Sequence, residues 1–262
     1  MNRSINISSI QVGFDFTQDC DYWPDFWERN DGLGAGKVDP DSDSQMLRAY
    51  HKTLWSKELP NGDYFNLEYD GGYLSFRNMR LGSDSITASF RYKRYKEMMD
   101  ECIRYYGKEA FHNRIEEYLH NTYTIGGAIL FPKHQNSINQ CRGRNSYICD
   151  RWDLTLECIR RFYKGITAPK DNPLGEVLLS DKSFFDLFVD FRGYCEFFFL
   201  QDCVSENYEE VKTFIPMEFF PTQSPLPKTL ELYNLWLQNN ENFVKLRNER
   251  IRAYIKETTD YI

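Results

Sequence analysis

The stretch from Ile138 to Tyr163 mixes charged and large apolar side chains at spacings that suit a binding or catalytic site. If a helix runs from Asp150 to Tyr163, with about 100° between successive residues, most of its charges lie opposite its apolar residues. Arg151 is the exception, so we expect it to be buried and bonded to a carboxylate or to backbone carbonyls. The charged residues of the stretch are Arg142, Arg144, Asp150, Arg151, Asp153, Glu157, Arg160 and Arg161.

This pattern has two interpretations. The first is a solvated stripe, in which Glu157 pairs with arginines three and four residues later for about 0.2–0.5 kcal/mol per pair. The second is a slot inside the fold, because the apolar side covers more than half of the helix. Carboxylates beside arginines hold charged substrates in such slots. On the second interpretation Glu157, Arg151 and Asp153 are the candidate catalytic residues.

Several segments together resemble a known family. They include "LRAYHKTLWSK", "INQCRG" and "DRWDLTLECIR", and the resemblance runs from about Phe14 to Ile251. The family they resemble is an uncharacterised bacterial one that carries a domain of unknown function. The resemblance therefore implies membership without implying an activity.

A second resemblance is to mono-ADP-ribosyltransferases of the bacterial toxin kind, which cleave NAD at the nicotinamide bond. It rests on His51 in "YHKTLW", on the hydroxyls of Ser83 and Ser85 in "GSDSI", and on Glu157. It implies that His51 and the serines bind NAD, that Arg142 helps to hold the pyrophosphate, and that Glu157 stabilises an oxocarbenium-like ribosyl centre. Glu196 in "GYCEFFF" is the alternative carboxylate. The resemblance further implies a toxin or phage-defence effector that modifies a protein or RNA target. It also implies a partner, either an antitoxin or a regulatory protein.

Two other function classes stay open. Asp150, Asp153 and Glu157, with Asp84, could hold Mg²⁺ for cleavage of RNA or DNA while arginines bind phosphate. The C-terminal segment "FVKLRNERIRAYIKE" could instead dock a partner, which would make the chain a non-catalytic interaction module. The four histidines form no HxxxH pair and the cysteines no CxxC pair, so we expect no metal centre.

Composition narrows the setting. The formal net charge is −7, which disfavours a general nucleic-acid coat protein because phosphate binding needs a positive field. Seven scattered cysteines predict reduced thiols, and the N-terminal stretch lacks the pattern of a secretory signal. The most apolar window is interrupted by charges well short of the roughly 20 residues that cross a bilayer. We therefore expect a cytoplasmic protein without a membrane anchor.

Periodicity and turn signals predict a single α+β domain over residues 1–262, mostly an antiparallel sheet with packed helices and a helical C-terminal subregion. Residues 17–43 are expected to form an acidic surface loop. The segment "YCEFFFLQ" stays undecided between strand and helix. The expected elements are a helix capped by Ser44 and ending at Trp55, a hairpin of "YFNLEY" and "YLSF", strands at "DSITASF" and "YTIGGAILF", and helices over 93–106, 109–120, 150–163, 182–191 and in two segments of 228–262.

Overall fold

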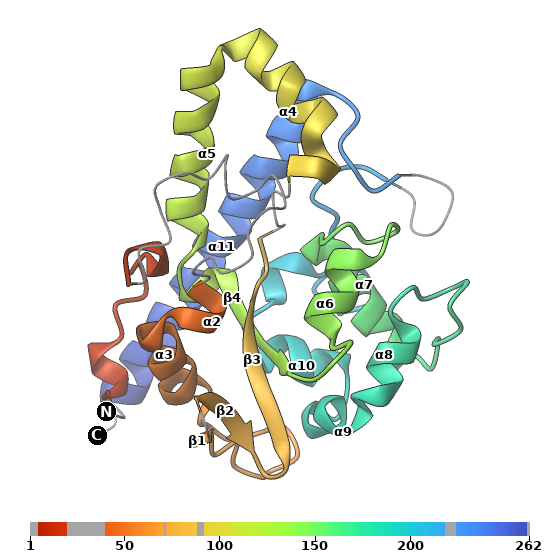
Figure 1. Cartoon of the computed structure of the whole chain (residues 1–262). Coiled ribbons are helices and arrows are strands. Elements are labelled where there is room, and N and C mark those ends of the chain that lie inside the picture. Colours follow the sequence, from red (N-terminus) through yellow and green to blue (C-terminus); the bar gives the residue numbers. More distant parts are fainter. Residues whose placement is uncertain (1–4, 20–39, 71, 88–91, 218–223, 261–262) are drawn as a thin grey trace.

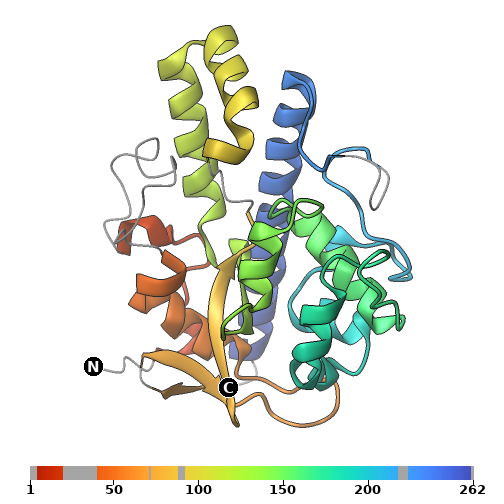
Figure 2. The ribbon, with the colours of Figure 1, turned by 45° about the vertical axis from the view of Figure 1, so that its right-hand side comes forward.

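The computed structural model describes residues 5–19, 40–70, 72–87, 92–217 and 224–260. It is an α+β fold: a small antiparallel sheet lies between a group of N-terminal helices and a larger group of later helices (Figure 1). The C-terminal helix runs along the molecule beside both groups, which is visible again after a 45° turn (Figure 2). The predicted fold class is therefore confirmed.

The sheet has four strands in the order β1-β2-β3-β4, and every neighbouring pair is antiparallel. The hairpin predicted from the turn signals is confirmed as β1 and β2. The strand predicted at "DSITASF" is displaced, because β3 begins at Met79 and ends before Ile86, while residues 88–90 lie outside the described residues. All five residues of β4 are buried. The strands are Glu68–Asp70, Tyr73–Phe76, Met79–Ser85 and Ala128–Pro132.

Two helices begin near the predicted acidic loop. Helix α3 (Gln45–Trp55) starts where the sequence predicts, because the Ser44 side chain accepts a hydrogen bond from the Leu47 N–H at 2.9 Å. The prediction of a loop over residues 17–43 was wrong at both ends. The 3₁₀ helix η2 (Phe16–Asp19) lies at one end, and helix α2 (Pro40–Asp43) lies at the other. Residues 20–39 of that expectation lie outside the described residues.

Helices α4 (Tyr92–Tyr106) and α5 (Lys108–Thr122) form the upper part of Figure 1, and α11 (Leu230–Asp260) runs from there to the C-terminal end at the lower left. Helices α4 and α5 match their predicted bounds within two residues and join at Gly107, whose φ of 85° suits glycine. The expectation of two C-terminal helices was wrong, because α11 is one helix. Two polar residues in the middle of α11 bond to other parts of the chain. Asn239 donates to the Phe214 carbonyl, and Glu241 accepts from Arg114.

The helices to the right of the sheet in Figure 1 are short apart from α7 (Trp152–Tyr163). Helix α7 begins two residues later than predicted, because Cys149 and Asp150 have φ of 49° and 63°. The helix predicted over 182–191 is interrupted at Val189, whose φ is 70°. The first half of "YCEFFFLQ" is helical, because it belongs to α10. The remaining elements are α6 (Ile138–Arg144), α8 (Gly175–Ser180), α9 (Lys182–Phe185), α10 (Phe191–Phe197), η1 (Ile7–Ser9), η3 (Ile125–Gly127), η4 (Asp186–Phe188) and η5 (Gln201–Cys203).

The core is largely aromatic. Trp55 at the end of α3 lies against Phe198 with ring centroids 5.2 Å apart, and Phe188 lies 5.2 Å from the same phenylalanine. These contacts join the N-terminal helices to the α9–α10 region through one continuous cluster of buried residues. None of the helices in the described residues is both long and apolar enough to cross a membrane.

Candidate functional site

Glu157 lies on α7 with only 2% of its side chain exposed. Arg160 binds both of its oxygens, through Nε at 2.7 Å and Nη2 at 2.8 Å, and Arg161 Nε adds a third bond at 2.7 Å. The sequence predicts this pairing, but the interpretation as a solvated stripe was wrong for Glu157 and for Asp153, which are both buried. Three charge-assisted bonds hold the carboxylate of Glu157 in place.

Arg151 and Asp153 form a second buried pair. Arg151 is fully buried, as the sequence predicts, and its Nε lies 3.0 Å from Asp153 Oδ1, while its Nη2 binds Oδ2. Arg151 also donates to the Pro225 carbonyl at 2.8 Å, and Asp153 Oδ2 accepts from the Phe214 N–H at 2.9 Å. The pair therefore connects the start of α7 by hydrogen bonds to Phe214 and Pro225, which precede α11 in the chain.

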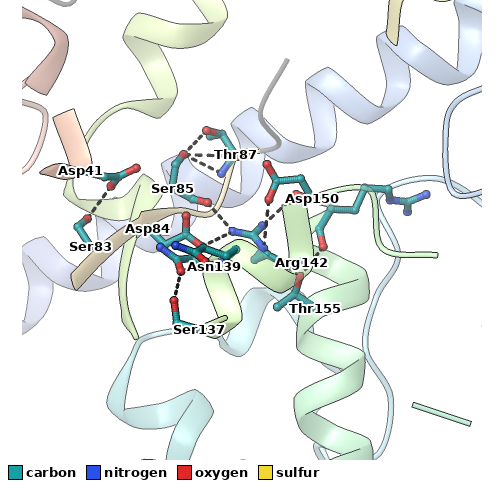
Figure 3. A network of polar contacts seen from close by, with 12 residues as sticks. Asp41, Ser83, Asp84, Ser85, Thr87, Ser137, Asn139, Arg142, Asp150 and Thr155 are labelled. Carbon is teal, nitrogen blue, oxygen red and sulfur yellow. Dashed lines mark hydrogen bonds and ion pairs between the residues drawn. The ribbon is translucent and has the colours of Figure 1, made fainter. Parts of the chain in front are cut away.

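Arg142 on α6 is the centre of a third network (Figure 3). Its Nη1 lies 2.8 Å from Asp84 Oδ2 and 2.7 Å from the Ser85 carbonyl, and its Nε lies 3.1 Å from Thr155 Oγ1. Burial alone would lower the pKa of Arg142, but Asp84 and then Asp150 outweigh it, so that the pKa is raised. The guanidinium stays charged and joins α6, α7 and the end of β3.

Ser83, one residue before Asp84, belongs to a different group of side chains. Its hydroxyl donates to Asp41 Oδ1 at 2.6 Å, and it lies 3.0 Å from His51 Nε2 (Figure 3 shows Ser83 and Asp41). His51 Nδ1 in turn accepts from the indole N–H of Trp55 at 2.8 Å. The result is a chain of hydrogen bonds from Trp55 through His51 and Ser83 to the carboxylate of Asp41.

The directions of these bonds follow from the donors. An indole N–H can only donate, so Nδ1 of His51 is an acceptor and the proton of the neutral ring is on Nε2. Burial, and then the nearby Arg247, lowers the pKa of His51 to about 3, which keeps the ring neutral. Ser83 therefore accepts from His51 and donates to Asp41. Because both ring nitrogens of His51 are engaged, His51 orients Ser83 rather than removing its proton.

A cavity of about 390 Å³ opens at this chain. Asp41 and Asp43 of α2 line it together with Ser83 of β3, and Arg48 of α3 and Lys133 contribute positive charge. The volume falls in the range of small-molecule sites, and the mixture of carboxylates, cations and a hydroxyl suits a polar, charged ligand. Asp41, Arg48 and Lys133 were missed as site residues. Asp41 lies in "DPDSDS", whose alternating aspartates are typical of a solvated loop, and Arg48 and Lys133 lie outside that stretch.

The structure brings some of the predicted site residues together and separates others. His51 and Ser83 share the cavity with Asp41, whereas Ser85 bonds to Thr87 and contributes its carbonyl to Arg142. Glu157 is not among the residues that line this cavity. Strand β3 separates the two groups of side chains, since Ser83 faces the cavity and Asp84 binds Arg142.

The carboxylates proposed for a nuclease metal are engaged in the ion pairs described above: Asp84 and Asp150 with Arg142, Asp153 with Arg151, and Glu157 with two arginines. Within the described part of the chain, no group of three His, Cys, Asp or Glu side chains is arranged to hold a metal ion. The described cysteines are all free thiols, and burial raises the pKa of the Cys102 thiol to about 12.

A larger cavity of about 960 Å³ lies between α5 and α11. Its walls carry amides such as Gln238 and Asn242 and the bidentate pair of Arg114 with Glu241, with Nη1 to Oε1 at 2.9 Å. None of the candidate catalytic or NAD-binding residues lines it, but Lys245, Asn248 and Arg252 of the C-terminal segment that could dock a partner do.

Fold and side chains together define an α+β protein with a small polar cavity beside strands β2 and β3 and with buried ion pairs at β3, α6 and α7. The chain belongs to a family of unknown function, DUF6994, whose model matches residues 10–251. The family membership predicted from the sequence motifs is therefore confirmed. Comparisons with curated proteins and with solved structures found no match.

Proposed function

We propose that the cavity at Asp41 and Ser83 binds NAD and that the protein is an NAD-consuming ADP-ribosyltransferase. The observation that carries the proposal is the convergence of Ser83, a carboxylate and two cations on one cavity, with His51 holding Ser83 from behind. Arg48 and Lys133 supply the charge that a pyrophosphate needs. Asp41 supplies the carboxylate that a ribosyl cation needs.

In this proposal Asp41 takes the role first predicted for Glu157. An ADP-ribosyl transfer passes through a positively charged, oxocarbenium-like ribosyl centre, which an aspartate fixed beside it stabilises. The hydrogen bond from Ser83 at 2.6 Å fixes the direction of the Asp41 carboxylate before a ligand arrives. Glu157 already accepts three bonds from arginines, so a role for it in catalysis would require those bonds to rearrange.

The test is to incubate the purified protein with labelled NAD, total cell protein and RNA, and to follow nicotinamide release and label transfer. We expect turnover by the wild type and a loss of about 10²–10³-fold in kcat for Asp41→Asn, the usual magnitude when a preorganised electrostatic group is removed. Label on protein or on RNA identifies the target class.

Two matched variants locate the chemistry. Glu157→Gln tests the carboxylate predicted from the sequence, and Glu196→Gln tests the alternative, whose side chain is 44% exposed and paired with Arg192. Each variant is checked for an unchanged melting temperature. We expect both variants to keep activity. If Asp41→Asn is active and one of these two variants is not, the catalytic carboxylate is the residue changed in the inactive variant. No turnover in the wild type would contradict the proposal and favour the interaction-module class.

A further inference from the structure

Lys57 lies just after α3, and aromatic rings surround its amine. Its Nζ is 4.0 Å from the ring centroid of Phe199, 4.6 Å from Phe197 and 4.7 Å from Tyr254. The indole of Trp55 is 5.3 Å away on another side. Among the residues that the structure describes, the amine donates one hydrogen bond, to the Phe197 carbonyl at 2.7 Å. The half-buried side chain is thus partly shielded from water, and its amine has a neutral acceptor.

The charged group that faces Lys57 is a second cation. Arg247 of α11 is fully buried and lies over the same indole, with Cζ 5.7 Å from the ring of Trp55. It donates to the carbonyls of Phe198, Gly126 and Ala128, so its bonds do not neutralise its charge. Tyr254 is the other titratable group at the amine, and burial raises its pKa, so that it stays neutral.

This combination favours an uncharged amine. Burial, and then the positive charge of Arg247, lowers the pKa of Lys57 to about 7. The ring faces act in the opposite direction because they attract a cation. Burial in an apolar pocket and a neighbouring cation are the two features that make lysines nucleophilic in enzymes that use an amine.

We propose that Lys57 is a carbonyl-reactive lysine, at which small aldehydes form an imine with the ε-amino group. The lone pair of the uncharged amine attacks the carbonyl carbon, and the carbonyl electron pair moves to oxygen, which takes up a proton from nitrogen. The carbinolamine then loses water as the C=N bond forms. Amine and aldehyde thus give imine and water, and no oxidant or reductant is needed.

The test uses the intact protein with a low concentration of formaldehyde and with cyanoborohydride, whose hydride reduces the imine to a stable methylamine. Peptide mass spectrometry then gives the rate at each lysine between pH 6 and pH 10. The exposed Lys108 and Lys256 are internal references that also correct for the pH dependence of the reductant. At pH 7 a lysine with a pKa near 7 is half uncharged, against about 1 in 2,500 for an ordinary lysine, so its free amine is about 1,000-fold more abundant.

We expect Lys57 to be methylated at least about 10-fold faster than the references at pH 7, since its lower basicity and half-buried position offset part of that advantage. The rate at Lys57 divided by the rate at the references should be highest below pH 7 and should fall to half of its maximum near pH 7. Lys57→Met should remove the fast site, and Arg247→Met should move the midpoint to higher pH.

Methylation of Lys57 no faster than that of Lys256 at pH 7 would overturn the proposal, and so would a midpoint above pH 9. If Arg247→Met does not fold, the wild-type pH profile decides alone. In urea the rate at Lys57 should fall to that of the references, because its enhancement depends on the folded environment.

Discussion

Replacing Asp153 by Asn should strongly destabilise the protein. The substitution keeps the size of the side chain but removes the negative charge that faces Arg151. Both side chains are fully buried, so the guanidinium would be left in the core without a counter-ion. Breaking a buried pair by removing one partner costs about 3–5 kcal/mol, which is a large part of a typical total stability of about 5–15 kcal/mol.

Urea unfolding followed by circular dichroism measures this loss. The matched control is Asp186→Asn, which breaks the exposed pair of Lys182 and Asp186, whose side chains are 59% and 55% exposed. We expect that control to change the free energy of unfolding by no more than about 0.5 kcal/mol. The double variant Arg151→Met/Asp153→Leu should recover part of the lost stability, because it removes both charges, although the Phe214 N–H loses its acceptor.

A decrease of less than about 1 kcal/mol in the free energy of unfolding of Asp153→Asn would contradict this prediction. Water would then have to reach the Arg151 side chain, because the penalty of about 3–5 kcal/mol applies only to a desolvated charge. A double variant less stable than Asp153→Asn would contradict it as well, since it would show that the charges are not the source of the loss.

Two further predictions concern stability. The pKa of His51 is lowered from 6.5 to about 3 in the folded state, so the folded protein binds this proton less readily than the unfolded chain. The free energy of unfolding should therefore fall as the pH drops below about 6.5. This group contributes up to about 1.4 kcal/mol per pH unit. Urea unfolding between pH 7 and pH 4 should show a shallower decline in His51→Gln, and equal slopes would count against the buried neutral ring. Gly127→Ala should be severely destabilising, because its Cβ would lie 1.7 Å from the Thr122 carbonyl oxygen, whereas Gly143→Ala meets nothing closer than 3.9 Å and should leave the melting temperature within a few degrees. A folded Gly127→Ala of wild-type stability would show that this turn moves freely.

Elements with a strong local signal were predictable from the sequence. Ser44 caps α3 where expected, and the helical angle of Arg151 predicts its burial although it is the N-cap residue of α7. Positions where the backbone changes direction through non-glycine residues were not predictable. Asp150 and Val189 have positive φ; aspartate adopts it more often than most residues but also adopts many other conformations, and valine rarely adopts it, so neither predicts a helix boundary.

The site was predictable only in part, because its residues meet through the tertiary fold. His51 and Ser83 are 32 positions apart, and their hydrogen bond depends on how α3 lies beside β3. Asp41 comes from a short helix that sequence periodicity does not reveal in an acidic stretch. Glu157, in contrast, stands out in the sequence because its arginine partners are only three and four residues away, a spacing that makes an ion pair look like a site.

The most direct test of the central claim is a crystal structure of the protein grown with ADP-ribose at saturating concentration. We expect density for the ligand in the cavity lined by Asp41, Ser83 and Lys133, with the phosphates towards Arg48 or Lys133. Density beside Glu157 in place of the Arg160 and Arg161 contacts would contradict the claim, and so would crystals in which this cavity binds no ligand.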